Sequence, residues 1–154
     1  MNGRSASGMR KSPFYLLTVE DIEYLINEIR AIGADEEVFM FNRGARTSYS
    51  DTNDIVLVRG DFFPDQQSTH PRDLMSPRAV LAHEYYGHRA YRYTHFLKGA
   101  WNDEFRASYI AAKNTPNLSD DDRRCLVLDA IERAKEAGIT IKNNEFIRGV
   151  LYGY

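Results

Sequence analysis

The sequence has almost no cysteine, since Cys125 is the only one in 154 residues. A single thiol excludes an internal disulfide, so the fold must be held by its apolar core, with a bound metal as a second source of stability. Cys125 lies on an apolar stripe without a surrounding motif. This setting is typical of a small core residue rather than a nucleophile.

Long apolar runs and an excess of one charge are also missing. No segment approaches the roughly 18 apolar residues of a membrane span, and the first residues lack the apolar core of a signal peptide. Twenty basic and 22 acidic residues leave a formal charge of −2. This gives no electrostatic basis for a nucleic acid or an anionic membrane as partner. We expect a soluble protein, cytoplasmic as the sequence stands.

The chain does have the apolar content of a globular domain, because 43% of its residues are hydrophobic. A length of 154 residues suits one domain with its own core and leaves little room for a second. Residues 1–12 are small, polar and basic without a period, which predicts a flexible leader. The single domain is therefore expected to span residues 13–154.

The first half of the chain predicts one helix and a small sheet. Apolar residues recur at helical spacing between Thr18 and Gly33, and Thr18 with Asp21 has the spacing of a capping box. Residues 38–41 and 55–58 are short apolar runs of strand type, separated by a polar connection. We expect the two runs to form a small antiparallel sheet, which makes the fold class α+β.

The second half predicts three longer helices. Ser76-Pro77 is a hydroxyl cap followed by proline at the first helical position, and this helix should run to about residue 97. Residues 101–112 predict a second helix, and residues 119–138 a third with Cys125, Leu128 and Ile131 facing inward. The tail from residue 146 onward is too short to assign.

Two of the four histidines lie in one stretch, His83-Glu84-Tyr85-Tyr86-Gly87-His88, inside the helix that follows Ser76. Neutral imidazoles are good zinc ligands, and a glutamate directly after the first histidine is the arrangement of a hydrolytic zinc site. Zinc would lower the pKa of a bound water toward neutrality, and Glu84 would take its proton as the water attacks a carbonyl.

The spacing of the two histidines makes a physical demand on the helix. At about 100° per residue, histidines five positions apart diverge by about 140° on a regular α-helix, against roughly 40° for the common spacing of four. Both can aim at one ion only if the helix widens, as a π-bulge does. Gly87 lies within this step and would supply the backbone freedom.

A catalytic zinc site needs a third protein ligand, and a carboxylate on the next helix is the simplest source. Glu104 follows His88 by sixteen residues, so a turn and a returning antiparallel helix would bring it back beside the histidines. Asp103 is the alternative ligand. Neighbouring residues on a helix point about 100° apart, so only one of the two should reach the single Zn²⁺ ion.

The form His-Glu-x-x-Gly-His resembles the active-site helix of the dipeptidyl-peptidase III family, which belongs to the zincin metallopeptidases. The stretch around Glu104 is similar to the glutamate-bearing second helix of the gluzincins. The resemblance covers roughly residues 50–112. It implies a zincin-like fold in which a small antiparallel sheet packs on an active-site helix and a ligand helix, with further helices at both ends, and it implies a peptide or protein substrate.

The same resemblance assigns further residues. An aspartate four positions after the glutamate ligand steadies the first histidine in gluzincins, and Ser108, a weaker acceptor, stands there in this chain. The strand before the active-site helix pairs with the substrate, which points to the five residues Ile55, Val56, Leu57, Val58 and Arg59 as the substrate-binding edge. Compact zincins also occur as toxin domains delivered into other cells and as small intracellular peptidases.

Other residues and other functions remain open. Asp103 and His95, which lies on much the same helical face as His88, are further candidates to support the ligands. His70, in a polar loop before Pro71, is more simply an exposed histidine. The expected function is a zinc metallopeptidase. The alternatives are a catalytically inactive zincin-fold domain that binds a metal or a partner, and a helical interaction module.

Overall fold

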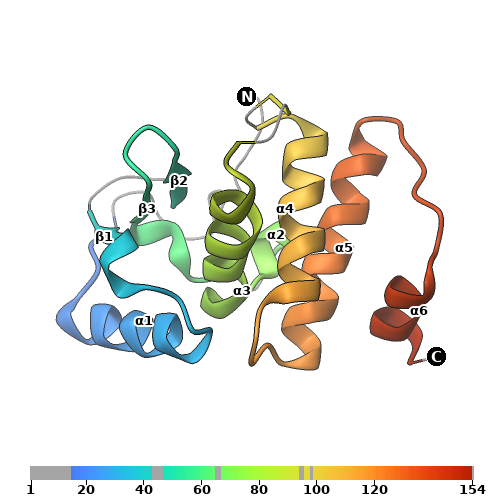
Figure 1. Ribbon diagram of the computed structural model, residues 1–154. Helices are drawn as coiled ribbons and strands as arrows, with labels where there is room; N and C mark the ends of the chain where they lie inside the picture. The colour runs from blue at the N-terminus through green and yellow to red at the C-terminus, as the bar shows by residue number, and fades with distance from the viewer. Residues whose placement is uncertain (1–14, 43–46, 65–66, 94–95, 98, 154) are drawn as a thin grey trace.

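The computed structural model describes residues 15–42, 47–64, 67–93, 96–97 and 99–153. Within these ranges it contains six α-helices and a three-stranded sheet, so the α+β class is confirmed. The sheet lies at one side of the molecule, followed by the helix that carries the two histidines, then α4, α5 and α6 (Figure 1). The predicted leader at residues 1–12 lies outside the described residues.

The sheet is mixed rather than antiparallel, which corrects the sequence prediction. Strands β1 (Phe39–Phe41), β2 (Ser48–Ser50) and β3 (Ile55–Val58) lie in the order β1-β3-β2. A tight turn in which Asp54 has a φ of 53° joins β2 to β3, so these two are antiparallel. The strand β1 pairs with the other edge of β3 and runs parallel to it.

This topology also corrects the predicted substrate-binding edge. The strand β3, which contains Ile55, Val56, Leu57 and Val58, is central and is paired on both sides within the chain. Its backbone groups are therefore already used in two ladders, and it has no open edge for a substrate. The edge strands are β1 and β2. The one that packs more extensively on the helix with the two histidines is β2, whose polar residues Ser48 and Ser50 made it hard to recognise as a strand.

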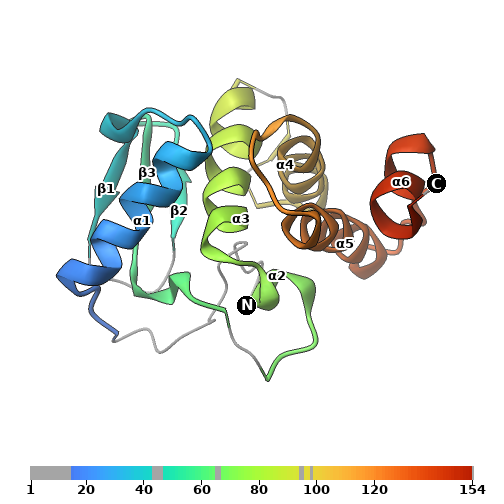
Figure 2. The same cartoon turned by 90° about the horizontal axis from the view of Figure 1, so that it is seen from below.

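Helix α1 (Val19–Ala31) covers one face of the sheet (Figure 2). It begins with the predicted capping box, in which the Thr18 hydroxyl accepts the Asp21 N–H and the Asp21 carboxylate accepts the Thr18 N–H. Its apolar stripe buries Leu25 and Ile29 fully against the core. Burial of this stripe, rather than helix propensity, holds the helix on the sheet.

The helical half is built from neighbouring antiparallel elements. Helices α2 (Pro71–Leu74) and α3 (Pro77–Ala82) lead into the segment η3 (His83–His88) and the short turn η4 (Arg89–Tyr91). Helix α4 (Trp101–Asn114) packs on η3 and also on α5 (Asp120–Glu136). The region from Ser76 is therefore helical to Tyr91, a shorter stretch than the prediction to residue 97.

The inward face of α5 is in part the one predicted. Cys125 and Ile131 are partly buried and pack against the core, whereas Leu128 is 39% exposed and the fully buried residues are Leu126, Val127, Ala130 and Ala134. The small residues at positions 130 and 134 let α5 lie close to its neighbours, and packing overrides the apolar pattern on which the prediction rested. Helix α6 (Glu145–Tyr152) forms in the tail, capped by Asn144. Among the described residues no helix is long and apolar enough to cross a membrane.

Candidate metal centre

The predicted widening of the helix at the histidines is confirmed. Helix α3 is capped by Ser76, whose side chain accepts the Ala79 N–H, and it continues without interruption into η3, a π-helical segment that spans His83–His88. The extra residue in this turn brings the two imidazole rings side by side, with their centroids 4.7 Å apart. A pair of histidines that would diverge on a regular helix therefore lies on one face.

Gly87 contributes close approach rather than backbone freedom. Its φ is not in the left-handed region, so no unusual conformation requires glycine at this position. A Cβ atom here would lie 2.4 Å from the backbone oxygen of Ala107 on α4. The missing side chain lets η3 and α4 approach at this point, which sets the distance between the histidines and the acidic residues of α4.

Glu104 is brought to both histidines, as the sequence predicted. Its Oε1 atom lies 3.0 Å from Nε2 of His83 and 3.2 Å from Nε2 of His88. One donor atom from each of these three residues lies within 4.8 Å of the others. His83 is fully buried and Glu104 is 7% exposed, so the cluster is closed from one side by α4 and α5.

The proton on His83 can be located from its neighbours. The Ser108 hydroxyl lies 2.6 Å from Oδ2 of Asp129 and 2.8 Å from Nδ1 of His83. A carboxylate only accepts, so the Ser108 proton goes to Asp129, and His83 must donate from Nδ1 to Ser108. The Nε2 atom of a neutral His83 then carries a lone pair that faces the Glu104 carboxylate across 3.0 Å. Two lone pairs at this distance repel each other unless a proton or a metal ion lies between them.

Asp103 lies beside His88 and does not join the cluster of His83, His88 and Glu104, which we call the triad. Its Oδ2 lies 3.6 Å from Nδ1 of His88 and accepts the Gly99 N–H, while its Oδ1 accepts a 2.6 Å hydrogen bond from Arg106. Asp103 therefore faces the ring nitrogen of His88 that points away from Glu104. At 3.6 Å it makes no hydrogen bond to that ring, and it lies as a charged neighbour of His88 rather than with the three converging donor atoms.

Glu84 is buried beside the triad and lines the same pocket as His88 and Glu104. Burial raises the pKa of Glu84 to about 8, although the neighbouring His88 opposes this effect. A carboxyl group with a pKa near neutrality is suited to take up and release a proton at physiological pH. A divalent cation close by would favour its ionised form.

The three triad residues also differ in charge preference. Burial lowers the pKa of His83, which keeps this imidazole neutral. Burial acts in the same direction on His88, but the Glu104 carboxylate outweighs it and raises the pKa of His88 to about 9. Burial disfavours the charged form of Glu104, yet His88 and His83 outweigh it and hold the pKa of Glu104 well below its usual range.

Several charged groups lie around the imidazoles. Four buried carboxyl groups and two largely buried guanidinium groups surround the rings: Glu84, Asp103, Glu104, Asp129, Arg106 and Arg133. In the metal-free protein the raised pKa values of Glu84 and His88 keep these groups close to neutral overall. When Glu84 is ionised and both imidazoles are neutral, as metal binding requires, the set carries a net charge of −2. Uncompensated buried charge is costly, and one divalent cation would offset it.

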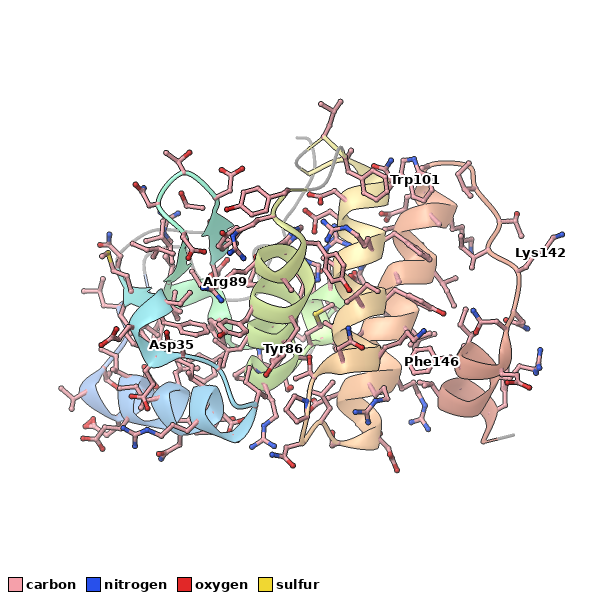
Figure 3. All side chains as sticks on the ribbon, in the orientation of Figure 1. Asp35, Tyr86, Arg89, Trp101, Lys142 and Phe146 are labelled. Atoms are coloured by element: carbon pink, nitrogen blue, oxygen red, sulfur yellow. The ribbon has the colours of Figure 1, made fainter. Side chains whose placement is uncertain are left out.

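A pocket opens beside the triad on the side of the sheet. The edge strand β2 contributes Ser48 and Tyr49, and the opposite wall carries Tyr91, Phe96 and Arg106. Tyr85 and Tyr86 lie elsewhere, because the Tyr85 hydroxyl accepts the Asp35 N–H and the Tyr86 hydroxyl donates to the Ile32 carbonyl. Tyr86 lies on the side of the helix toward the end of α1 (Figure 3).

Arg89 fixes the histidine-bearing segment to the sheet. Its guanidinium donates to both carboxylate oxygens of Asp54 at 2.9 and 3.1 Å, and it lies over the Tyr85 ring. The side chain extends from the segment after η3 toward the turn between β2 and β3 (Figure 3). This bidentate pair ties the edge strand to the segment that carries the histidines, so strand and triad keep one relative position.

Sequence reasoning missed Asp129 and Arg133, both on α5. Arg133 donates from Nε to Asp129 at 2.9 Å, and its Nη1 lies 3.7 Å from Glu104 Oε1. Their spacing of four is that of a common surface ion pair on a helix, so only the position of Ser108 one turn after Glu104 pointed to a missing acid. His95 lies outside the described residues.

Comparison of the chain with protein-family models, with curated proteins and with solved structures finds no match. The resemblance to the dipeptidyl-peptidase III family therefore rests on the six residues from His83 to His88 and on the stretch around Glu104, and the case for a metal centre rests on the geometry of these residues.

Proposed function

We propose that this protein is a zinc-dependent hydrolase that cleaves peptide bonds. One observation carries the proposal: Nε2 of His83, Nε2 of His88 and Oε1 of Glu104 converge on one place, from a π-helical turn and a facing helix. The fold proposed for it is zincin-like, with η3 as the active-site segment and α4 as the ligand helix.

The residues present fit zinc. Two imidazole nitrogens and one carboxylate oxygen are a catalytic zinc ligand set, and three protein ligands leave a fourth position open toward the pocket. When Glu84 is ionised and both imidazoles are neutral, the net charge of −2 around them also favours a divalent ion. Zinc held here supplies the Lewis acidity that lets water attack a carbonyl near neutral pH.

Glu84 is the proposed general base and then the general acid. Its carboxylate would accept a proton from the attacking water and return it to the nitrogen of the leaving amine. Burial raises the pKa of Glu84 in the metal-free protein, which favours the protonated form needed for the second transfer, and a bound cation would favour the carboxylate needed for the first. Its position in the pocket wall next to His88 places the carboxylate on the side from which a substrate would enter.

The substrate is proposed to be an extended peptide that lies along β2. This strand is at the edge of the sheet, and its residues Ser48 and Tyr49 line the same pocket as Glu84 and His88. Backbone hydrogen bonds to an open sheet edge bind a peptide without demanding a particular sequence. Tyr91 and Phe96 on the facing wall offer apolar surface for one of its side chains.

The test is the isosteric variant Glu84→Gln. It should retain one equivalent of zinc and lose roughly 100-fold or more of the peptide hydrolysis of the wild type, because proton transfer by a positioned side chain contributes about 10² to 10⁴ in rate. Hydrolysis is followed on a broad library of unstructured peptides and zinc by elemental analysis. Glu23→Gln, at an exposed position on α1, is the matched control.

Two outcomes would contradict the proposal in different ways. Full activity of Glu84→Gln would remove Glu84 from the mechanism. Stoichiometric zinc in the wild type without turnover of any peptide would favour the metal-binding domain without catalysis.

A further inference from the structure

A chain of hydrogen bonds starts at Nδ1 of His83, the ring nitrogen that does not face Glu104, and ends on helix α5. It passes from Nδ1 of His83 to the Ser108 hydroxyl at 2.8 Å, then to Oδ2 of Asp129 at 2.6 Å, where Arg133 donates from Nε at 2.9 Å. His83, Ser108 and Asp129 are fully buried and Arg133 is 5% exposed. All four polar groups are thus removed from water and depend on one another.

The direction of this chain is fixed from its far end. Arg133 can only donate, and Asp129 accepts from both Arg133 and Ser108 at the same oxygen. The serine proton is used by that bond, so its oxygen can only accept from His83. The charge on α5 therefore determines which nitrogen of an imidazole on η3 carries a proton.

We propose that Asp129 is a positioning residue of the metal centre and acts on His83 through the Ser108 hydroxyl. The chain keeps the proton on Nδ1 and the lone pair on Nε2 aimed toward Glu104. An outer carboxylate that holds the tautomer and orientation of a ligating imidazole is the usual way to raise its affinity for a metal. The helix α5 thereby becomes the third helix of the site.

The position of Arg133 connects the same chain to a second ligand. Its Nη1 lies 3.7 Å from Oε1 of Glu104, while its Nε holds Asp129. The ion pair on α5 thus contacts both His83, through Ser108, and Glu104 directly. A purely structural ion pair could lie anywhere along the packed faces of α4 and α5. This pair lies where the two ligands meet.

The test compares Ser108→Ala with Ser76→Ala. Ser76 also donates a 2.6 Å hydrogen bond to an aspartate of α5, Asp122, but has no histidine behind it. Two quantities are measured: the tautomer of His83 in metal-free protein, from the nitrogen chemical shifts of its imidazole ring, and the dissociation constant for zinc, from competition with a chelator.

In wild type and in Ser76→Ala, His83 should carry its proton on Nδ1. In Ser108→Ala the proton should move to Nε2, where Glu104 accepts it, and zinc affinity should fall by roughly 10- to 100-fold. Asp129→Asn should also weaken zinc binding. The double variant Ser108→Ala/Asp129→Asn should bind zinc with the affinity of Ser108→Ala alone. Loss of the Ser108 hydroxyl already removes the only link between residue 129 and His83 in the proposed chain.

Several results would overturn the proposal. A Ser108→Ala protein that is folded and keeps the wild-type tautomer would do so, as would an unchanged zinc affinity. Additive losses in the double variant would show that Asp129 acts without Ser108. The proposal rests on the metal-binding part of the function proposed above, but the tautomer is read without metal. A wild type that binds no zinc would therefore end the proposed function, while the tautomer still decides the role of the chain.

Discussion

Two clusters of histidine and glutamate occur among the described residues, and they look alike by distance alone. His83, His88 and Glu104 lie between η3 and α4, and His70, Glu132 and Glu136 lie where the start of α2 meets α5. In each, one donor atom per residue lies within 4.8 Å of the others. Proximity of ligand types therefore does not separate a metal centre from an ordinary polar contact.

The hydrogen bonds behind the imidazoles do separate them. In His70, Nδ1 accepts the backbone N–H of Arg72 at 3.2 Å, so the neutral ring carries its proton on Nε2 and donates it to Glu136 at 3.0 Å. That nitrogen has no lone pair for a metal. In His83 the polarity is reversed, because Nδ1 donates to Ser108 and Nε2 is left with the lone pair.

The two clusters also differ in the burial and the charge of their carboxylates. Glu136 is exposed, and its Oε1 lies 3.6 Å from Nη1 of Arg72. Solvent and this guanidinium therefore already stabilise its negative charge. The carboxylates around His83 are buried, so solvent does not screen their charge. The comparison teaches that the groups behind a histidine, more than its distance from an acid, decide whether it is arranged to bind a metal.

The largest expected effect is loss of zinc from His88→Gln but not from His70→Gln. The first variant removes one of three ligands, and its dissociation constant for zinc should rise by more than the roughly 10- to 100-fold typical of losing an outer partner. The second should bind zinc as the wild type does. Titration with a competing chelator measures both. Equal losses in the two variants would break the distinction between the clusters.

A smaller effect is expected when the approach of η3 and α4 is blocked. Gly87→Ala places a Cβ 2.4 Å from the Ala107 oxygen, which should cost roughly 2 to 4 kcal/mol of unfolding free energy. The melting temperature should fall by about 5 to 15 °C. Gly149→Ala is the control, because nothing lies within 4 Å of its Cβ and alanine favours the helix α6. A Gly87→Ala protein as stable as this control would refute the close contact.

The last expected effect is a pH dependence of the stability of the metal-free protein. Burial raises the pKa of Glu84 from 4.5 to about 8, so the folded state holds this proton more tightly than the unfolded chain does. The resulting stability is complete below about pH 4.5 and is lost as the pH rises toward 8. His88, whose pKa is raised to about 9, acts in the same direction at higher pH.

Urea unfolding from pH 5 to 8 should therefore show a decline of a few kcal/mol in the metal-free wild type and a smaller decline in Glu84→Gln. Saturating zinc should also reduce the decline in the wild type, since the cation favours the ionised carboxylate. Identical slopes in the two metal-free proteins would contradict the burial of a titrating Glu84.

Much of this arrangement could be predicted from the sequence because it depends on local spacing. The cap at Ser76, the five-residue step from His83 to His88 and the return of α4 to Glu104 all follow from helix geometry. The short polar strand β2 could not be predicted, since Ser48 and Ser50 become a strand only by pairing with β3.

The partner of Ser108 was also beyond reach from the sequence. Asp129 is 21 positions away and reaches Ser108 only because small residues let α5 pack against α4. Gly87 was predicted at the right place for a different reason, because a Cβ clash with Ala107 depends on how two helices approach. Contacts between elements, unlike spacing within one, are set by tertiary packing.

The most direct test of the metal centre is an anomalous difference map from crystals grown with zinc, recorded at the zinc absorption edge. We predict one strong peak, about 2.0 to 2.2 Å from Nε2 of His83, Nε2 of His88 and a carboxylate oxygen of Glu104. A peak beside His70, Glu132 and Glu136 instead, or no peak near His83 at saturating zinc, would contradict the account.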